Sequence, residues 1–541
     1  MTKYLFKRIL HGLLSVVAVV MLVMILIFVA GNALGKRDKI FAEDPIYQRK
    51  LNSSGKNDEE IYKYEQWEKY GYLDYVHYSE YLIDLKNNGE IDEATRKAAV
   101  DIPFKSKNDE GVVAEYVRKF TDYYESKGYT VVRLDAQMQN RTDAVDGGEQ
   151  QLFAYKNTLI VLRLLSFFSN VIQVDNIHYV KDDIEDRGLT FTLYDPVYNT
   201  EPGTGEVTKK VFSPAIIGNG TRHKYLLYFD SNFPFIHQNL VTINLGTSYS
   251  VNRGVDVFDT MVSPQGALVK SMVTYPTGNV MERADNLHTA TYSGAGIKDS
   301  SPMLANRFTD DYTNVDSVLQ NKSRLAYSFI IGLIASLLAY CVALPVGIMM
   351  ARKKDKLLDK LGTLYIIFIL ACPSLAYIFM VQALGRAAGM PYQFDLAKEN
   401  AIMFILPIVS LAMPTIAGLM KWLRRYMIDQ MNADYVKFAR SGGLSEGEIF
   451  RKHIFKNAAI PIVHGIPGSI LGALVGAIIT EKIYYVPGVG NLLTEAISKY
   501  DNSVIIGLTL FYALISITSV ILGDILMAMT DPRISFTNKA R

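Results

Sequence analysis

Six long apolar segments constrain the fold of this chain more than any other feature of its 541 residues. Each reaches the roughly 20 residues that a helix needs to cross a bilayer. They cover residues 9–30, 325–350, 361–384, 401–420, 459–480 and 504–530. Hydrocarbon cannot hydrogen-bond a free peptide group, so each segment must form a helix. The sequence therefore predicts a mainly α-helical, polytopic membrane protein with six transmembrane helices.

The positions of Lys and Arg predict how these helices are oriented. Cations are concentrated before the first segment, at 352–360, at 421–456 and after the last segment, while the short loops between them hold few. Short loops rich in Lys and Arg remain in the cytoplasm, and long translocated domains do not enter this count. We therefore expect a multi-pass plasma membrane protein with both termini cytoplasmic. Residues 1–31 are expected to hold the first helix, with a cleaved signal peptide as the alternative.

The polar region at 32–324 is then expected to be a large extracellular α+β domain inserted between the first and second membrane helices, with the other helices in 325–541. About 32–175 has apolar residues at helical spacing, and about 176–306 alternates β-branched and aromatic residues between turn sequences. Both cysteines, Cys341 and Cys372, lie in apolar segments, so no disulfide is expected in this domain. Its histidines are too far apart in sequence to indicate a metal site.

One further apolar segment, at 158–174, bears on the number of membrane spans. It is short for a span and contains Arg163. We expect it to be a buried helix of the extracellular domain. The alternative, a seventh span, would place the cationic loops that follow it outside the cell.

The polar segment at 421–458 is predicted to form a helical hairpin. A basic helix is expected to stop at Gly442 and Gly443, because glycine adopts the left-handed conformation that ends helices. Ser445 and Glu448 then have the spacing of a capping box, which starts a second basic helix. Such a rigid hairpin is suited to enter a groove on a soluble partner. The alternative is a solvated basic loop that only fixes the topology.

Three stretches of sequence carry a resemblance to a known family: DYVKFARSGGLSEGEIFRKHIFKNAAIPIV at 434–463, YVPGVGNLLTEAI at 485–497 and DPRI at 531–534. They resemble the B-type permease subunits of oligopeptide and dipeptide ABC importers, in the Gram-positive form with a large extracellular domain. In that family the hairpin docks on ATPase subunits, and its signature is Glu-Ala-Ala with Gly four residues after the last Ala. Here Lys437 and Phe438 replace the Glu and the first Ala. The resemblance implies these ATPase-coupling residues: Asp434, Tyr435, Ala439, Arg440, Gly443, Leu444, Ser445, Glu448, His453 and Asn457.

The resemblance also implies a function and a set of partners. The chain would be the permease subunit of an ATP-driven importer of oligopeptides, assembled with a second permease, two cytoplasmic ATPases and an extracellular peptide-binding lipoprotein. No G-x-x-x-x-G-K-[ST] phosphate loop occurs in the sequence, so ATP and Mg would be bound by the ATPases and not by this chain. The near-neutral net charge of +2 does not indicate nucleic acid. A membrane-anchored receptor and an ion-driven carrier working alone are the alternatives.

Within the spans, small residues and prolines are the informative features. Gly468, Gly472 and Gly476 recur every four residues and predict a face for close helix packing, with lining of the transport path as the alternative. Prolines in the second to fifth spans allow bends there or are static kinks. Asp524 is expected to be satisfied by a neighbouring helix or by interfacial water, and a direct role in transport is the alternative.

Overall fold

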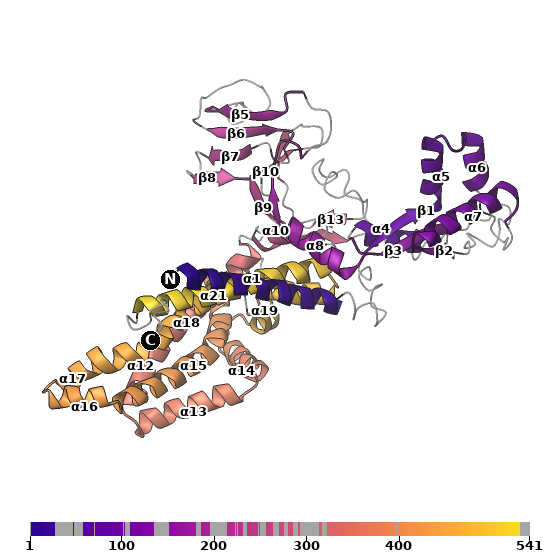
Figure 1. The fold of residues 1–541 in the computed structure, drawn as a ribbon. Helices are drawn as coiled ribbons and strands as arrows, with labels where there is room; N and C mark the ends of the chain where they lie inside the picture. The colour runs from indigo at the N-terminus through magenta and orange to yellow at the C-terminus, as the bar shows by residue number, and fades with distance from the viewer. Residues whose placement is uncertain are drawn as a thin grey trace. The chain divides into compact units, whose positions relative to one another are not determined.

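A computed structural model of the chain shows two compact units (Figure 1). The first consists of Met1–Val23, Gln173–Ala290 and Val315–Arg541, and the second of Met24–Ile172 and Thr291–Asn314. The structure describes residues 2–27, 47, 58–69, 71–100, 102, 109–134, 151–179, 185–194, 212, 214–221, 223, 225–230, 235–246, 248, 251, 256–262, 270–274, 280–284, 290–292, 313–315, 322–395, 398–475 and 477–530. The predicted motif at 531–534 and Gly476 lie outside these residues.

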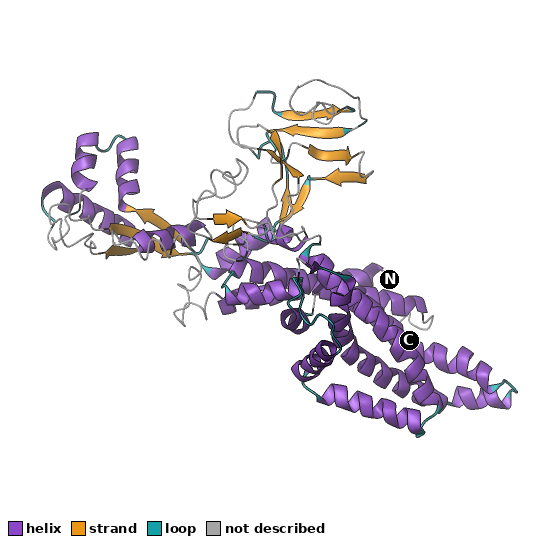
Figure 2. Ribbon diagram, turned by 180° about the vertical axis from the view of Figure 1, so that it is seen from behind, coloured by secondary structure: helices purple, strands orange, loops and turns teal. Residues whose placement is uncertain are grey.

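The second unit packs helices around a small antiparallel sheet (Figure 2). The order of its strands is β1-β3-β2. Its core holds side chains from both layers, among them Leu82, Phe120 and Leu152, each almost fully buried. The elements are α4 (Asp58–Lys69), β1 (Leu73–His77), α5 (Tyr78–Asn87), α6 (Glu93–Val100), α7 (Gly111–Ser126), β2 (Thr130–Leu134), β3 (Gln151–Asn157), α8 (Ile160–Asn170) and the strand pair β12 (Ala290–Tyr292) and β13 (Thr313–Val315).

Helix α8 differs from its prediction. It was expected to be buried in the domain, but none of its residues is buried. The prediction was wrong because the apolar sequence of α8 does not determine where the helix packs. The core of this unit is formed by α5, α6, α7 and the sheet, and α8 contributes no residue to it.

The strand-rich segment belongs to the same compact unit as the long apolar helices. Four antiparallel strands form one sheet in the order β5-β6-β7-β8 (Figure 1). The elements are β4 (Ile172–Val174), β5 (Gly188–Thr192), β6 (Ala215–Asn219), β7 (Tyr225–Asp230), β8 (Phe235–Gln238), β9 (Val241–Ile243), α10 (Val257–Val262), β10 (Lys270–Thr274) and β11 (Val280–Ala284). The short helix α10 contacts α12 and α21, two of the long apolar helices.

Four helical segments of the described chain are long and apolar enough to cross a membrane. They are α1 (Thr2–Ile25), α12 (Arg324–Arg352), α15 (Ile405–Met431) with the 3₁₀ turn η4 (Ala401–Phe404) before it, and α21 (Asn502–Thr530). Two bent pairs bring the number to as many as six if each pair counts as one span. The first pair is α13 (Leu357–Ala371) with α14 (Ser374–Ala387). The second is the helical run from α17 (Glu446–Ile449) through α18 (Lys456–Val475) with α19 (Ile478–Tyr484).

The third apolar segment is therefore not one straight helix. Helices α13 and α14 meet at an angle of 112°. The break lies at Cys372, whose backbone is extended (φ −76°, ψ 131°) because the ring of Pro373 disfavours the helical conformation in the residue before it. The structure thus has a sharp bend before Pro373, and both interpretations of the prolines, as static kinks or as places where helices rearrange, stay predictions.

The apolar helices share a core built mainly from α12, α13, α14 and α15. Tyr327 and Tyr484 are among its fully buried side chains, and the hydroxyl groups of Tyr484 and Ser410 are hydrogen-bonded at 2.9 Å. Gly347 lets α12 approach α15 closely, since a Cβ at this position would lie 3.2 Å from a methyl group of Leu423. This packing positions the C-terminal ends of α12 and α15 and the start of α18, where the predicted hairpin lies.

Candidate functional site

The predicted hairpin is formed by α16 (Asp434–Ser441), α17 (Glu446–Ile449) and the π-helical turn η5 (Phe450–Phe455), which runs directly into α18 (Figure 1). Gly443 has φ +80°, and its N–H donates to the carbonyl of Arg440. The N–H of Leu444 donates to the carbonyl of Ala439, which completes a Schellman motif. Ser445 and Glu448 form the predicted capping box. The glycine stop and the restart of the helix are both confirmed.

The first arm of the hairpin differs from its prediction. One basic helix was expected from 421 to the glycines, but α15 continues to Met431 and a break at Asn432 and Ala433 precedes α16. The physical reason is burial: Val436 is fully buried together with Leu423 and Met427 of α15. A continuous helix would carry Val436 away from them and into solvent.

A single apolar cluster, which we call the hairpin core, joins this hairpin to three long helices. Its buried members are Ala351 of α12, Leu423 and Met427 of α15, Val436, Ile449 and Ile454 of the hairpin, and Ala458 and Ile462 of α18. Packed interiors are dense and transmit displacement. The hairpin core therefore holds the hairpin as a stiff extension of α12, α15 and α18.

Polar contacts strengthen this attachment. The side-chain amide of Asn457 donates to the hydroxyl of Tyr435 at 3.1 Å, and that hydroxyl donates to Gln430 at the end of α15. The ring of Tyr435 also lies 6.3 Å, centroid to centroid, from that of His453. Three of the predicted coupling residues, Tyr435, His453 and Asn457, are thus partly buried inside the hairpin, where they fix its shape.

The other predicted residues lie on or near the outer surface of the hairpin. Ala439 is half-buried, whereas Asp434, Arg440, Gly443, Leu444, Ser445 and Glu448 are exposed. Arg440 pairs with Glu446, with its Nη2 atom 3.1 Å from Oε2. Lys437 pairs with Asp434 at 2.8 Å and holds the pKa of that carboxyl below its usual range. The tip is therefore polar and largely self-paired.

Phe438 is the exception on this polar tip. Its side chain is 75% exposed, the position is the one where the resembling family has a small Ala, and it neighbours the charged Lys437. Leu444, across the glycine turn, is 37% exposed. Phe438 is thus the more exposed of two large apolar side chains at the tip, and charged residues surround it.

A buried ion pair connects α13 to α15 near the hairpin. Arg424 donates to both oxygens of Asp359, at 2.6 and 2.7 Å, and the backbone N–H of Asp355 also donates to this carboxylate. Asp359 is 2% exposed. Because Arg424 directly follows Leu423 of the hairpin core, the pair extends the rigid region to α13.

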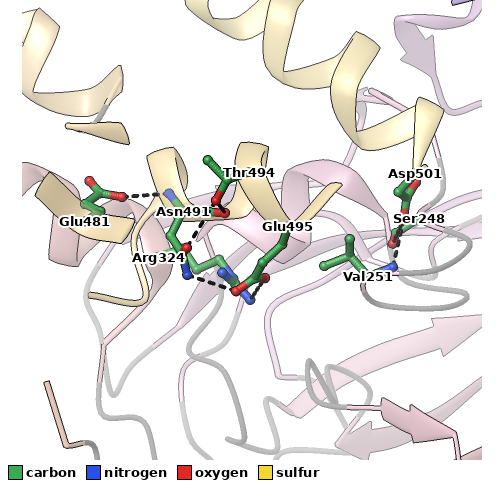
Figure 3. Close-up of polar contacts among 8 residues, drawn as sticks. All are labelled: Ser248, Val251, Arg324, Glu481, Asn491, Thr494, Glu495 and Asp501. Carbon is green, nitrogen blue, oxygen red and sulfur yellow. Dashed lines mark hydrogen bonds and ion pairs between the residues drawn. The ribbon is translucent and has the colours of Figure 1, made fainter. Parts of the chain in front are cut away.

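A second polar cluster lies at the opposite end of α12 (Figure 3). The carboxylate of Glu481 is 1% exposed and accepts from Ser328 at 2.7 Å and from the backbone N–H groups of Ala477 and Asn491. A Cβ at Gly488 would lie 2.2 Å from this carboxylate, so only glycine fits there. The carboxylate thereby holds α19 and the start of α20 (Val489–Ser498) against α12.

Two further contacts complete this cluster (Figure 3). We call it the outer cluster, because the orientation predicted from the Lys and Arg residues would place it at the extracellular end of α12. Arg324, at the start of α12, pairs with Glu495 of α20 at 3.0 Å. Asp501 is fully buried and accepts from the hydroxyl of Ser248 at 2.6 Å and from the N–H of Val251 at 2.9 Å. These two hydrogen bonds attach the segment that follows β9 to the turn between α20 and α21.

The predicted packing glycines have no neighbour inside the described part of the chain. A Cβ at Gly468 or Gly472 would meet nothing within 4 Å, and the close approach of α18 is instead at Ala473, against Gly332 of α12. Packing through the glycines therefore remains a prediction. Asp524 is satisfied by a neighbouring helix, as expected: Arg8 of α1 lies 2.9 Å from it.

Comparison with known proteins decides the family. A family model described as "Binding-protein-dependent transport system inner membrane component" matches residues 343–536. The oligopeptide transport system permease protein AmiC of Streptococcus pneumoniae is 34% identical over 542 residues, covering 100% of this chain and 99% of AmiC. This chain belongs to the oligopeptide and dipeptide permease family of ABC importers. It is therefore a multi-pass membrane protein and a transport component, not an ATPase.

Shorter relatives match part of the permease. The dipeptide transport system permease protein DppB of Lactococcus lactis subsp. cremoris is 30% identical over 225 residues, which cover 41% of this permease and 73% of DppB. The oligopeptide transport system permease protein AppB of Bacillus subtilis is 28% identical over 225 residues, covering 40% and 71%. The match to AmiC runs through the whole chain, so that relative shares the long region between α1 and α12.

Sequence reasoning missed most of the buried polar groups of the permease. Asp359, Glu481 and Asp501 fall just outside the apolar segments, where a charge normally indicates solvent. A signal was present: Glu481 precedes a Gly-rich turn, in which backbone N–H groups are free to bind a carboxylate. Among the described residues, no group of three or more His, Cys, Asp or Glu is placed to hold a metal ion.

Proposed function

We propose that this permease imports oligopeptides and is driven by two cytoplasmic ATPases that dock on the hairpin of α16 and α17. The observation that carries the proposal is the hairpin core, because it joins an exposed, rigid tip to the inner ends of α12, α15 and α18. A loop that only fixed the topology would not need a buried core, a Schellman stop and a capping box. The family membership of the chain supports the same role.

The proposed topology has six spans in the plasma membrane, with each bent pair counted as one span. Both termini and the hairpin are cytoplasmic, and the region between α1 and α12 is extracellular. The distribution of Lys and Arg supports this orientation. A cysteine in place of Arg440 should resist a membrane-impermeant thiol reagent added outside intact cells. Labelling from outside would reverse the orientation and remove the basis for ATPase docking.

The proposed assembly also contains a second permease and an extracellular peptide-binding lipoprotein. The exposed small-residue face of α18, at Gly468 and Gly472, supports close packing against a helix of the second permease. The extracellular region receives the lipoprotein, and closure of the ATPases around ATP pushes the hairpin. The hairpin core then moves α12, α15 and α18 together, which switches the access of the transport path. ATP and Mg are held by the ATPases.

In this proposal, the two residues that depart from the family signature, Lys437 and Phe438, determine how the hairpin contacts the ATPases. Lys437 replaces the family's Glu, so a contact made by that carboxylate is absent here. Phe438 instead supplies an exposed aromatic side chain at the tip. Aromatic anchors that fill a pocket dominate the affinity of many protein interfaces. Phe438 is therefore proposed as the residue that enters the ATPase surface.

A matched pair of glycine substitutions tests the coupling role. Gly443 has φ +80° and a valine there is strained, whereas Gly447 has an ordinary helical backbone. Both positions have open space for a Cβ. In proteoliposomes that contain the complete importer, Gly443→Val should abolish ATP-driven uptake of oligopeptide and reduce ATPase co-purification, while Gly447→Val retains both. Normal uptake with Gly443→Val in correctly inserted protein would contradict the proposal.

A further inference from the structure

A cavity lies at the C-terminal end of α14, and its lining contains no residue of the hairpin or of the outer cluster. It has a volume of about 650 Å³ and is walled by α14 and the segment that follows it, within residues 374–395, all of which are described. Cavities of roughly 300–1,000 Å³ are typical of sites for small ligands. The rings of Phe379 and Tyr392 in its wall are 53% and 37% exposed, so a ligand can reach both.

Local contacts fix the wall of this cavity. Gly389 has φ +77°, and the N–H of Met390 donates to the carbonyl of Gly385 at 2.9 Å, which is the hydrogen bond of a Schellman motif at the end of α14. The chain then turns back along the helix, where the side-chain amide of Gln382 donates to the carbonyl of Tyr392 at 2.9 Å. Tyr392 is therefore held beside α14.

Arg386 gives the cavity a positive charge. Its guanidinium lies 4.9 Å from the centroid of the Tyr392 ring, and it forms no ion pair with a carboxylate of the described residues. None of the described residues that line the cavity is acidic. By contrast, Arg8, Arg324 and Arg424 each pair with a carboxylate. The uncompensated charge of Arg386 favours an anionic ligand, and a guanidinium suits phosphate or carboxylate oxygens.

The face of α14 that carries Arg386 changes from apolar to polar along its length. Leu375, Phe379, Gln382 and Arg386 are four, three and four residues apart, so they follow one another on one side of the helix. Leu375 and Phe379 are 51% and 53% exposed. Leu375 and Arg386 are 11 positions apart, which is about 16 Å of helix and close to half of the ~30 Å hydrocarbon thickness. A phospholipid has the same order of groups, an acyl chain and then a charged head group, over a similar distance.

We propose that this cavity binds an anionic phospholipid, with the phosphate at Arg386 and an acyl chain along Phe379 and Leu375. A zwitterionic lipid would bring its own cation beside Arg386, where the lining offers no carboxylate to pair with it, so an anionic head group is preferred. The chain is a membrane protein, and α14 belongs to one of its candidate spans. The proposal depends neither on ATPase docking nor on which side of the membrane Arg386 occupies.

Native mass spectrometry of the full-length permease tests this site. The purified chain is titrated in detergent with phosphatidylglycerol, which is anionic, or with phosphatidylcholine of the same acyl chains, which is zwitterionic. Arg386→Ala removes the cation, and Ala383→Trp fills the cavity while Arg386 is kept. The control is Arg425→Ala. Arg425 of α15 also stacks on an aromatic ring, with its guanidinium 5.7 Å from the centroid of Trp422, but it does not line the cavity.

The unmodified permease should bind phosphatidylglycerol more tightly than phosphatidylcholine. Arg386→Ala and Ala383→Trp should each weaken the tightest phosphatidylglycerol site several-fold, and Arg425→Ala should leave it unchanged. Equal weakening by Arg425→Ala would show that any exposed cation attracts this lipid and would overturn the proposal. Unchanged binding with Ala383→Trp would place the lipid outside the cavity and would do the same. Tight binding of an oligopeptide in place of the lipid, lost with Arg386→Ala, would assign the cavity to a peptide carboxylate and would overturn it equally.

Discussion

Removal of the Phe438 side chain separates docking from folding. The side chain is 75% exposed and is not a member of the hairpin core, so Phe438→Ala should leave the stability of the permease unchanged. An aromatic side chain buries roughly 150–250 Å², and three quarters of that area at ~25 cal/mol per Å² gives about 3–5 kcal/mol for complete burial. Because part of this gain offsets the ordering of the side chain, we expect a loss of about 2–3 kcal/mol. The affinity for the ATPases should then fall about 30- to 140-fold.

The measurement is equilibrium binding of the purified ATPases to the permease pair in nanodiscs. Lys437→Ala is the matched control, since Lys437 is adjacent, exposed and engaged only in a local pair with Asp434. It should change the affinity little, because exposed ion pairs contribute little. Phe438→Leu should retain most of the binding. If Phe438→Ala bound the ATPases as tightly as the unmodified permease, the tip would not be the docking surface and the assignment of Phe438 would be wrong.

Three further predictions concern the hairpin core, the ion pair of Asp359 and Arg424, and the exposed glycine face of α18. Ile449→Ala leaves a cavity in the hairpin core and should destabilise the hairpin by about 2–5 kcal/mol; limited proteolysis at the hairpin should accelerate. Asp359→Ala leaves the partly exposed Arg424 without its carboxylate and should cost about 1.5–3 kcal/mol. The double change Asp359→Leu with Arg424→Met should recover much of this loss, as read from thermal unfolding in detergent. Gly472→Leu meets open space within the chain, so the isolated permease should keep its melting temperature while co-purification of the second permease is lost.

The features that sequence predicted well are set by neighbouring residues. The stop at Gly443 and the capping box of Ser445 and Glu448 need only backbone geometry and side chains a few residues apart. The bend at Pro373 is local for the same reason. These elements form in the same way whatever surrounds them, so their sequence signals are sufficient.

The features that sequence missed depend on distant contacts. The break before α16 exists because Val436 packs on α15, and no local signal distinguishes it from a continuing helix. Asp501 is buried because Ser248 and Val251, about 250 residues earlier in the chain, donate to it. The exposure of α8 likewise depends on which elements fill the core of its unit. Only the tertiary structure shows what each of these groups contacts.

Helix α12 is placed to connect the two ends of the permease. Ala351, near its C-terminal end, belongs to the hairpin core, and Arg324 and Ser328, near its other end, bind Glu495 and Glu481 of the outer cluster. Ser328 and Ala351 are 23 positions apart in α12, which corresponds to about 35 Å of helix. Helix α12 packs on α15 and α18, and Pro345 is the interior residue at which it can bend. If α12 moves as one body, a displacement of the hairpin core appears at its outer contacts. Weakening the outer cluster should therefore reduce the uptake gained per ATP hydrolysed, even though the ATPases still bind the intact hairpin.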